Sequence, residues 1–234
     1  KSTWSGSITV DAKANNSDDV KVIVYVTDNA GNSVNNEKKP CELKINSTPP
    51  TATLTSDDTA AITDEDGRGY FTAGRTLKLT ITDRAATFNK QNAIDGFSVT
   101  ATDADKNPIK DENGNVIEQP YTLGAWSSNG DEHSVTVTFP YDGYYEWSYQ
   151  YTNKADLSFV TDEINTDACV SPFDFTVDTK APTGTISVDE ENGWSQLIEV
   201  LTFGVWKNTK VEVTAVGDDE GGSGWDQKPL YYKG

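Results

Sequence analysis

Few residues in the sequence could do chemistry, and the only histidine is the first to consider. His133 opens an expected strand at a polar turn, beside Asp131 and Glu132, which favours a surface turn residue over a catalytic base. The sequence contains no nucleophile elbow, no phosphate-binding loop and no set of cysteines and histidines with metal-ligand spacing. Pairs of carboxylates are so frequent that none of them indicates glycoside hydrolysis. We therefore predict no catalytic residues and no enzyme.

The acidic loops could instead supply the oxygen ligands that calcium prefers. In TDEDGRG (63–69) and DADKNP (103–108), however, Arg68 takes an alternate ligand position and Pro108 stands where the loop needs glycine. Both segments depart from the EF-hand pattern, so solvated turns are the favoured interpretation. A weak calcium site near DDEGG (218–222) stays open. No other metal or cofactor is predicted.

Aromatic side chains are the remaining candidates, because exposed ones anchor protein partners. The stretch YDGYYEWSYQY (141–151) holds the densest group of them. Trp126 in the loop AWSSNGDEH, together with Tyr141 and Tyr144, forms the set of candidate ligand-binding residues. Further candidates are Trp194, Trp206, Tyr231 and Tyr232. Of these, the two tryptophans are expected to pack in a core or at its rim.

The composition limits the class of partner. The chain has 234 residues and carries 37 acidic and 19 basic side chains, a net charge of −18. This charge repels a phosphate backbone and an anionic membrane surface, which argues against nucleic acid as a partner. No apolar stretch approaches the roughly 18 residues needed to cross a bilayer, so membrane insertion is not expected. The length suggests more than one domain.

The elements that must position these residues are strands. Apolar and polar residues alternate with a period of two in segments rich in valine, isoleucine, threonine and aromatics. These segments are 7–12, 20–27, 77–82, 97–103, 133–139, 173–177 and 209–215. No segment keeps a helical period for long, and the pairs Asn113-Gly114 and Asp142-Gly143 mark turns. The pattern predicts an all-β fold of antiparallel sheets.

Two segments of the chain recur later in the sequence. INSTPPTATLT (45–55) is similar to VDTKAPTGTIS (177–187) at an offset of 132 residues. VYVTDNAG (24–31) aligns with YQYTNKAD (149–156) at an offset of 125, so the later copy carries an insertion after residue 156. Because the matches keep their order along the chain, they indicate a repeated structural unit.

The repeat sets the expected domain boundaries. A third, shorter match pairs TWS (3–5) with AWS (125–127) and lies ahead of the other two in both copies. The chain is therefore divided into the end of one domain, a complete domain with long loops and the start of another, at residues 1–47, 48–179 and 180–234.

Four motifs resemble those of a known family. TDNAGN (27–32), FPYDGYYEW (139–147), FTVDTKAPTGTI (175–186) and the run at 202–224 are similar to the tandem bacterial immunoglobulin-like (Ig-like) domains of large surface proteins of Gram-positive bacteria, notably gut Firmicutes. The resemblance covers the whole chain and implies tandem antiparallel β-sandwiches, one complete and two partial. The middle unit departs from the family at TNKADLS (152–158), where T-D-x-A-G-N is expected, so this loop is predicted to be rebuilt.

The resemblance also implies where the protein works and what it does. It implies export to the bacterial cell surface or cell wall, with any signal or anchor outside this sequence. The leading prediction is non-catalytic binding of a host protein through loops or a sheet edge of the middle domain. Some surface proteins of this type bind host immunoglobulins through variable-domain frameworks, so superantigen-like antibody binding is the specific prediction. The alternatives are a passive stalk of a giant adhesin and a carbohydrate-binding accessory module.

The offset of 125 residues assigns an orientation to the dense aromatic stretch. It places four aromatic residues on four alternate valines of the first unit: Tyr145, Trp147, Tyr149 and Tyr151 on Val20, Val22, Val24 and Val26. Because alternate valines mark an inward face, these four aromatics are predicted to be structural core, and Tyr141 and Tyr144 remain as the outward pair.

The aromatic core raises further expectations. Tyr145 follows a turn, where a tyrosine corner would bond its hydroxyl to nearby backbone. The extra volume requires the sheets to splay apart, or facing strands to use small residues such as Ala101. The phenolic oxygens of Tyr149 and Tyr151 must also find partners.

The two cysteines and the two partial units complete the expectations. Cys41 lies in the last strand of the first unit and is interpreted as a small buried residue, whereas Cys169 lies in a loop as a partly exposed free thiol. Residues 1–47 supply late strands of a sandwich and residues 180–234 supply early ones, and neither part can bury an apolar face alone. We therefore expect head-to-tail self-association, in which the partial units of neighbouring molecules complete each other.

Overall fold

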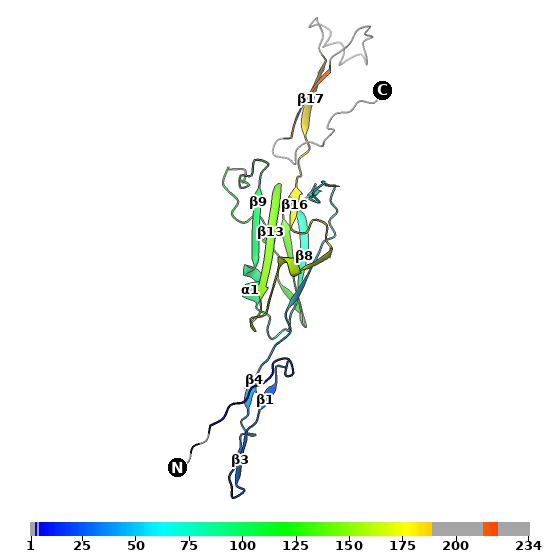
Figure 1. Cartoon of the computed structure of the whole chain (residues 1–234). Helices are drawn as coiled ribbons and strands as arrows, with labels where there is room; N and C mark the ends of the chain where they lie inside the picture. The colour runs from blue at the N-terminus through cyan, green and yellow to red at the C-terminus, as the bar shows by residue number, and fades with distance from the viewer. Residues whose placement is uncertain (1–2, 4, 189–212, 220–234) are drawn as a thin grey trace.

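The computed structural model describes residues 3, 5–188 and 213–219, which are almost entirely strands and loops. The only helices in this part of the chain are α1 (Lys90–Asp95) and the short 3₁₀ helix η1 (Thr161–Glu163). The prediction of an all-β fold is therefore confirmed, although α1 was not predicted. Figure 1 shows the N-terminal strands at one end, the largest group of strands in the middle and β17 (Thr183–Val188) at the other end.

The first of two large sheets has six strands, with β8 and β12 paired along their whole length. The sheet runs in the order β10, β12, β8, β5 and β15, and β11 also pairs with β12. These strands are β5 (Thr51–Thr55), β8 (Arg75–Thr82), β10 (Thr122–Leu123), β11 (Ser127–Asn129), β12 (Glu132–Phe139) and β15 (Asn165–Ala168). Leu77, Leu79 and Ile81 alternate along β8 and are fully buried, so one face of this sheet is the core face.

The second sheet also has six strands, arranged around the long strand β13. Strand β9 pairs with one edge of β13, while β16 and β14 share the other edge. Strand β16 then pairs with β7 in parallel, and β7 pairs with β6. These strands are β6 (Ile62–Thr63), β7 (Gly69–Phe71), β9 (Phe97–Thr102), β13 (Gly143–Thr152), β14 (Ser158–Val160) and β16 (Asp174–Val177).

The hydrophobic core contains the inward residues of both sheets. It includes the four aromatics predicted to be core, Tyr145, Trp147, Tyr149 and Tyr151, all of which are buried. They alternate along β13 with exposed or half-buried residues, as the period of a strand requires. The Tyr145 hydroxyl donates a hydrogen bond to the Tyr141 carbonyl oxygen at 2.8 Å, which is the geometry expected of a tyrosine corner.

Helix α1 packs against the aromatic strand β13. The Tyr149 hydroxyl donates to the Ala93 carbonyl oxygen at 3.0 Å, and burial raises the pKa of this tyrosine. Gly96 ends the helix so close to β13 that a Cβ there would collide with the Gln150 carbonyl oxygen. Ala101, predicted to lie on a facing strand, instead lies beside Tyr145 on the neighbouring strand β9 of the same sheet. The Tyr149 phenol thus finds its hydrogen-bond partner on a helix that the strand pattern did not predict.

The N-terminal strands form an interrupted hairpin with little burial. Strand β1 (Val20–Val22) pairs with β4 (Cys41–Leu43), and β2 (Tyr25–Thr27) pairs with β3 (Ser33–Asn35). The prediction of one continuous strand over 20–27 is therefore wrong at residues 23 and 24, and the strand expected at 7–12 is not formed. Cys41 is exposed rather than buried, because no second sheet covers this hairpin among the described residues.

The segment between β14 and β16 extends the first sheet. After β14 the chain forms η1 and then β15, which crosses to the first sheet and pairs in parallel with β5. Buried Arg75 holds the end of this segment by donating to the carbonyl oxygens of Ser171, at 2.6 Å, and Val170. Cys169 is a half-buried free thiol, and burial raises its pKa.

A polar joint connects the N-terminal strands to the middle sheets. The Arg84 guanidinium donates to the Ile45 carbonyl oxygen at 2.9 Å and the Asn16 side-chain oxygen at 2.7 Å, and it pairs with Asp18 at 3.1 Å. Asn46 also donates to the Thr87 hydroxyl at 2.9 Å. Because the guanidinium binds several oxygens in fixed directions, these bonds define how the two parts meet.

Candidate functional site

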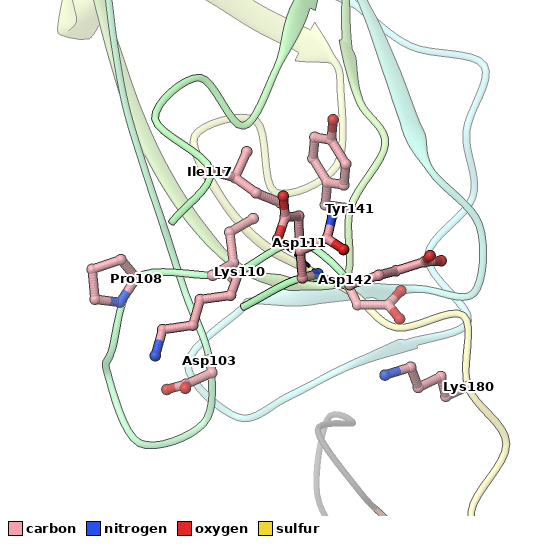
Figure 2. Close-up of a pocket in the computed structure, with 11 residues that line it drawn as sticks. Asp103, Pro108, Lys110, Asp111, Ile117, Tyr141, Asp142 and Lys180 are labelled. Carbon is pink, nitrogen blue, oxygen red and sulfur yellow. Dashed lines mark hydrogen bonds between the residues drawn. The ribbon is translucent and has the colours of Figure 1, made fainter. Parts of the chain in front are cut away.

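The candidate site lies at the end of the two large sheets that faces β17, where loops converge on two neighbouring hollows. The larger hollow, of about 600 Å³, lies between the loop 103–117, the turn at Tyr141 and Asp142, and Lys180 (Figure 2). The smaller, of about 430 Å³, lies between Arg68, the end of β9 and Tyr144. Asp103 lines both, so the two predicted outward tyrosines lie at adjacent parts of one surface.

Two five-residue turns position the acidic side chains of the larger hollow. Asp103 begins the first turn, and its Oδ1 accepts hydrogen bonds from the amides of Asp105 and Asn107, both at 2.9 Å. Asp111 begins the second in the same way, accepting from the amides of Asn113 and Asn115 at 2.9 Å. These hydrogen bonds favour the charged carboxylate and lower the pKa of both aspartates. Both therefore keep a fixed negative charge at the edge of the hollow.

The same turn recurs elsewhere in the structure. Asp28, Asp64 and Asn153 each accept hydrogen bonds from the amides two and four residues later. The fourth residue of each turn has a positive φ, at Gly31, Gly67, Lys106, Gly114 and Asp156. The loop after β13 was predicted to be rebuilt, but Asn153 and Asp156 keep the turn that Asp28 and Gly31 make. That prediction is wrong at the turn, and the difference begins only after β14.

The acidic loops considered as calcium ligands contain these five-residue turns. Their leading carboxylates already accept bonds from their own backbone, as Asp64 does in the segment 63–69. In the part of the chain that the structure describes, no group of three acidic, cysteine or histidine side chains is arranged to hold a metal ion. The calcium site considered near 218–222 lies mostly outside the described residues.

Tyr141 is the most accessible aromatic residue of the site. The residue is 42% exposed and lines the larger hollow, while its carbonyl oxygen accepts the hydrogen bond of the buried Tyr145 hydroxyl. The backbone position of Tyr141 is thus fixed by the core, whereas its ring is available for contact. A fixed, exposed aromatic ring is the kind of residue that anchors a protein partner.

Tyr144 is half-buried beside the smaller hollow. The Arg68 guanidinium lies over its ring, 5.4 Å from the centroid, and burial raises the pKa of this tyrosine. Arg68 also pairs with Asp174 at 2.6 Å and Glu146 at 3.7 Å. Because Arg68 covers part of the ring, Tyr144 offers less free aromatic surface than Tyr141.

The charged groups around the larger hollow are mostly acidic. Asp103, Asp111, Glu112 and Asp142 line it together with two cations, Lys110 and Lys180. The Asp142 carboxylate accepts hydrogen bonds from the Thr179 amide at 2.9 Å and the Thr179 hydroxyl at 2.8 Å. This contact fixes the start of the segment that leads to β17, so Lys180 stays beside the hollow. Figure 2 shows Asp111 and Asp142 between the two lysines.

Trp126 lies away from this surface, near the other end of β13. It is half-buried and packs against the core, with its ring 5.7 Å from that of Phe88. Its Nε1 is buried and has no hydrogen-bond partner in the structure. The structure therefore does not bring Trp126 together with Tyr141 and Tyr144. The other candidate aromatics, Trp194, Trp206, Tyr231 and Tyr232, lie outside the described residues.

His133 was predicted to be a surface turn residue, and this prediction is wrong. The residue is only 2% exposed, and its ring stacks on Phe88 with centroids 3.7 Å apart. One ring nitrogen, Nε2, bonds the Asp83 carbonyl oxygen at 3.1 Å, and Nδ1 bonds the Ser128 hydroxyl at 2.7 Å. The Ser128–His133 distance would suit a nucleophile and its base, but this pair lines neither hollow.

Asp83 is the centre of a buried polar cluster that the sequence analysis missed. Its carboxylate accepts hydrogen bonds from Tyr151 at 2.9 Å, Asn153 at 3.0 Å and Thr87 at 3.0 Å. The cluster satisfies the Tyr151 phenol, whose oxygen also accepts from the Asn89 amide at 2.9 Å. No local motif marks Asp83, because its partners come from separate segments of the chain. The cluster lies next to the Arg84 joint and is a structural site.

Comparison with known proteins adds no further assignment. The chain matches no protein-family model, no curated protein and no solved structure. Among the described residues, no helix is long and apolar enough to cross a membrane.

Proposed function

We propose that the chain is a non-catalytic binding segment of a bacterial surface protein, built from a complete Ig-like domain at residues 48–179 and parts of two others at residues 1–47 and 180–234. Strand order supports the Ig-like assignment of the middle domain. Strands β5, β8, β12 and β10 correspond to A, B, E and D of such a domain, and β9, β13 and β16 correspond to C, F and G. The hydrogen bond from Tyr145 to Tyr141 supports it as well.

The binding surface we propose is the loop end that contains the two hollows. The observation that carries the proposal is the exposed ring of Tyr141 at the edge of a hollow that four carboxylates and two lysines line. An aromatic anchor within a field of fixed negative charge suits a protein partner that presents a basic or amide-rich loop. Host immunoglobulin variable domains, suggested by the resemblance of the sequence to bacterial Ig-like domains, are the first partner to test.

The proposal is tested by immobilising the chain and measuring its binding to host immunoglobulins and to other serum and mucus proteins. We expect the Tyr141→Ala variant to weaken binding at least tenfold, because the loss of an anchor residue typically costs about 2 kcal/mol or more. Tyr25→Ala is the matched control, since Tyr25 is also exposed but lies on the N-terminal hairpin. Added salt should weaken binding by screening the carboxylates. Equal binding by both variants, or retention of none of these proteins, would contradict the proposal.

A spacer is the second candidate function, and the Arg84 joint favours it. A guanidinium that bonds Asn16, Asp18 and Ile45 would hold successive domains in a fixed line. Small-angle scattering of the wild-type chain and of the Arg84→Ala variant tests this candidate. If the chain is a rigid spacer, the wild-type particle should be longer and narrower than the variant. The carbohydrate-binding alternative has less support, because the ring of Trp126 packs on Phe88.

A further inference from the structure

Two asparagines followed directly by glycine lie in exposed turns of the middle sandwich. Asn113-Gly114 belongs to a five-residue turn beside the larger hollow, and Asn129-Gly130 lies between β11 and β12. Asn-Gly is the pair most prone to deamidation, because a glycine without a Cβ lets its backbone nitrogen approach the asparagine side chain. At both glycines an added Cβ would meet no atom within 4 Å, so exposure and space do not distinguish the two pairs. A third pair, at 192–193, lies outside the described residues.

Hydrogen bonds restrain the first pair. The Gly114 amide donates to the Asp111 carbonyl oxygen at 3.0 Å. The Asn113 amide donates to Asp111 Oδ1 at 2.9 Å. The nitrogen that would attack the asparagine side chain is therefore engaged, and the backbone of the asparagine itself is fixed by the same aspartate.

The second pair has no such restraint. Asn129 pairs with Glu132, so Gly130 and Asp131 form a two-residue hairpin turn. Gly130 has a φ of 62°, which suits a glycine at the first position of such a turn. Among the described residues, neither the Gly130 amide nor the Asn129 side chain has a hydrogen-bond partner. The Gly130 nitrogen is therefore available to attack the side chain before it.

We propose that Asn129 is a self-modification site of the folded chain, where the asparagine deamidates in water while Asn113 is protected. The Gly130 nitrogen attacks the side-chain carbonyl carbon of Asn129. The bond from this carbon to the side-chain nitrogen breaks, and that nitrogen leaves as ammonia with the proton of the Gly130 amide. Water then opens the cyclic imide at either carbonyl carbon, with its hydroxyl going to carbon and its proton to nitrogen. The product is aspartate or isoaspartate at position 129.

The modified turn weakens the polar joint at Arg84. Asp131 accepts at its carbonyl oxygen from the Asp83 amide at 2.9 Å, and at Oδ1 from the Ala85 amide at 3.0 Å. These two bonds flank Arg84, whose guanidinium contacts the N-terminal part of the chain. Isoaspartate inserts one methylene group into the main chain of a two-residue turn, so Asp131 can no longer keep its place relative to Glu132. Deamidation therefore loosens residues 83–85.

Peptide mapping by mass spectrometry of the full chain, aged in mildly alkaline buffer, tests this proposal. We expect Asn129 to deamidate at least about tenfold faster than Asn113, because the Gly114 hydrogen bond and its turn must open before that pair reacts. Asp111→Ala removes the carboxylate that closes the protected turn, and it should raise the rate at Asn113 without changing the rate at Asn129. In urea, where both turns are lost, the two rates should converge.

Two results of this experiment would overturn the proposal. The first is an equal rate at both asparagines in the folded chain, or a faster rate at Asn113. The second is a difference that persists unchanged in urea, since it would then come from the neighbouring residues in the sequence and not from the turns.

Hydrogen exchange tests the effect on the joint. In the aged chain the amides of Asp83 and Ala85 should exchange faster, in proportion to the isoaspartate at position 129. Asn129→Gln is the matched control, because it keeps a side-chain amide but would have to close a larger, six-membered ring. Ageing should leave exchange at both amides unchanged in this variant. Unchanged exchange in deamidated wild type, or the same increase in the aged variant, would contradict the link to the joint.

Discussion

The N-terminal hairpin and strands β13, β14 and β16 share one turn and one register, but they differ in burial. Tyr25 pairs with Asn35 as Gln150 pairs with Val160, each 125 residues later in the sequence. In the sandwich the inward residues of β13 are buried aromatics, whereas Val24 and Val26 of the hairpin are about half exposed. Local pattern is therefore enough to specify pairing and turn geometry, because both depend on neighbouring residues and on hydrogen bonds within a few positions. Burial depends in addition on a second sheet, which the pattern of one strand cannot supply.

Equivalent substitutions in the two regions should give the largest difference in stability. Tyr149→Ala removes a fully buried ring and its bond to Ala93, and we expect the free energy of unfolding to fall by about 3–5 kcal/mol. Val24→Ala, at the equivalent exposed position, should change it by less than about 0.5 kcal/mol. Urea denaturation of dilute, monomeric protein, followed through the aromatic near-ultraviolet signal, measures both. A large effect of Val24→Ala under these conditions would mean that the hairpin is buried within the monomer.

The equivalent turn residues should show a smaller difference. Asn153 is buried, donates to Asp83 and accepts from the turn amides, so we expect Asn153→Ala to cost about 1–3 kcal/mol. Asp28→Ala breaks the same turn in the hairpin, where the side chain is exposed, and should leave unfolding of the sandwich unchanged. Asn153→Asp is a useful third variant, because it can still accept from the turn amides but places a second carboxylate beside Asp83. If Asn153→Ala unfolds like the wild type, the buried cluster does not stabilise the sandwich.

The smallest expected effect concerns the pKa of the aspartates that begin the turns, which should be lowered in both regions. Hydrogen bonds from Asn32, Asn107 and Asn115 lower the pKa of Asp28, Asp103 and Asp111 respectively. A lowered folded-state pKa stabilises the turn above the unfolded value of about 3.9, and this contribution is lost as pH falls through the folded pKa. Carbon-detected NMR titration should show all three carboxyls titrating below that value. If Asp28 titrated with its ordinary pKa while the other two carboxyls did not, the hairpin turn would not form in solution.

Strand positions were largely predictable, because period-two alternation identifies them wherever a second sheet provides cover. Strands β8, β9, β12 and β16 lie within two residues of the expected segments, and the orientation of the aromatic strand followed from the repeat. The same alternation at 7–12 was misleading, because these residues form no strand in the described structure.

The candidate site was harder to predict than the core. Tyr141 was identified because strand parity left it outside, but no sequence pattern could show that the loop 103–117 folds beside it. Trp126 and His133 were misjudged for one reason: Phe88, which lies in a segment without alternation, packs against both rings. Helix α1 was missed because six residues are too few to show a helical period.

The parallel pairing of β7 with β16 has a mechanical consequence for a chain held at both ends. The chain reaches β7 from its N-terminal side and leaves β16 towards its C-terminus, and Phe175, Thr176 and Val177 lie opposite Gly69, Tyr70 and Phe71. Tension would slide these two strands along each other in opposite directions. Their hydrogen bonds, extended by the bond from the Asp178 amide to the Phe71 carbonyl oxygen at 2.9 Å, would carry the load in shear and break together. A short pair of strands at the exit of the domain would then set the force at which the domain opens.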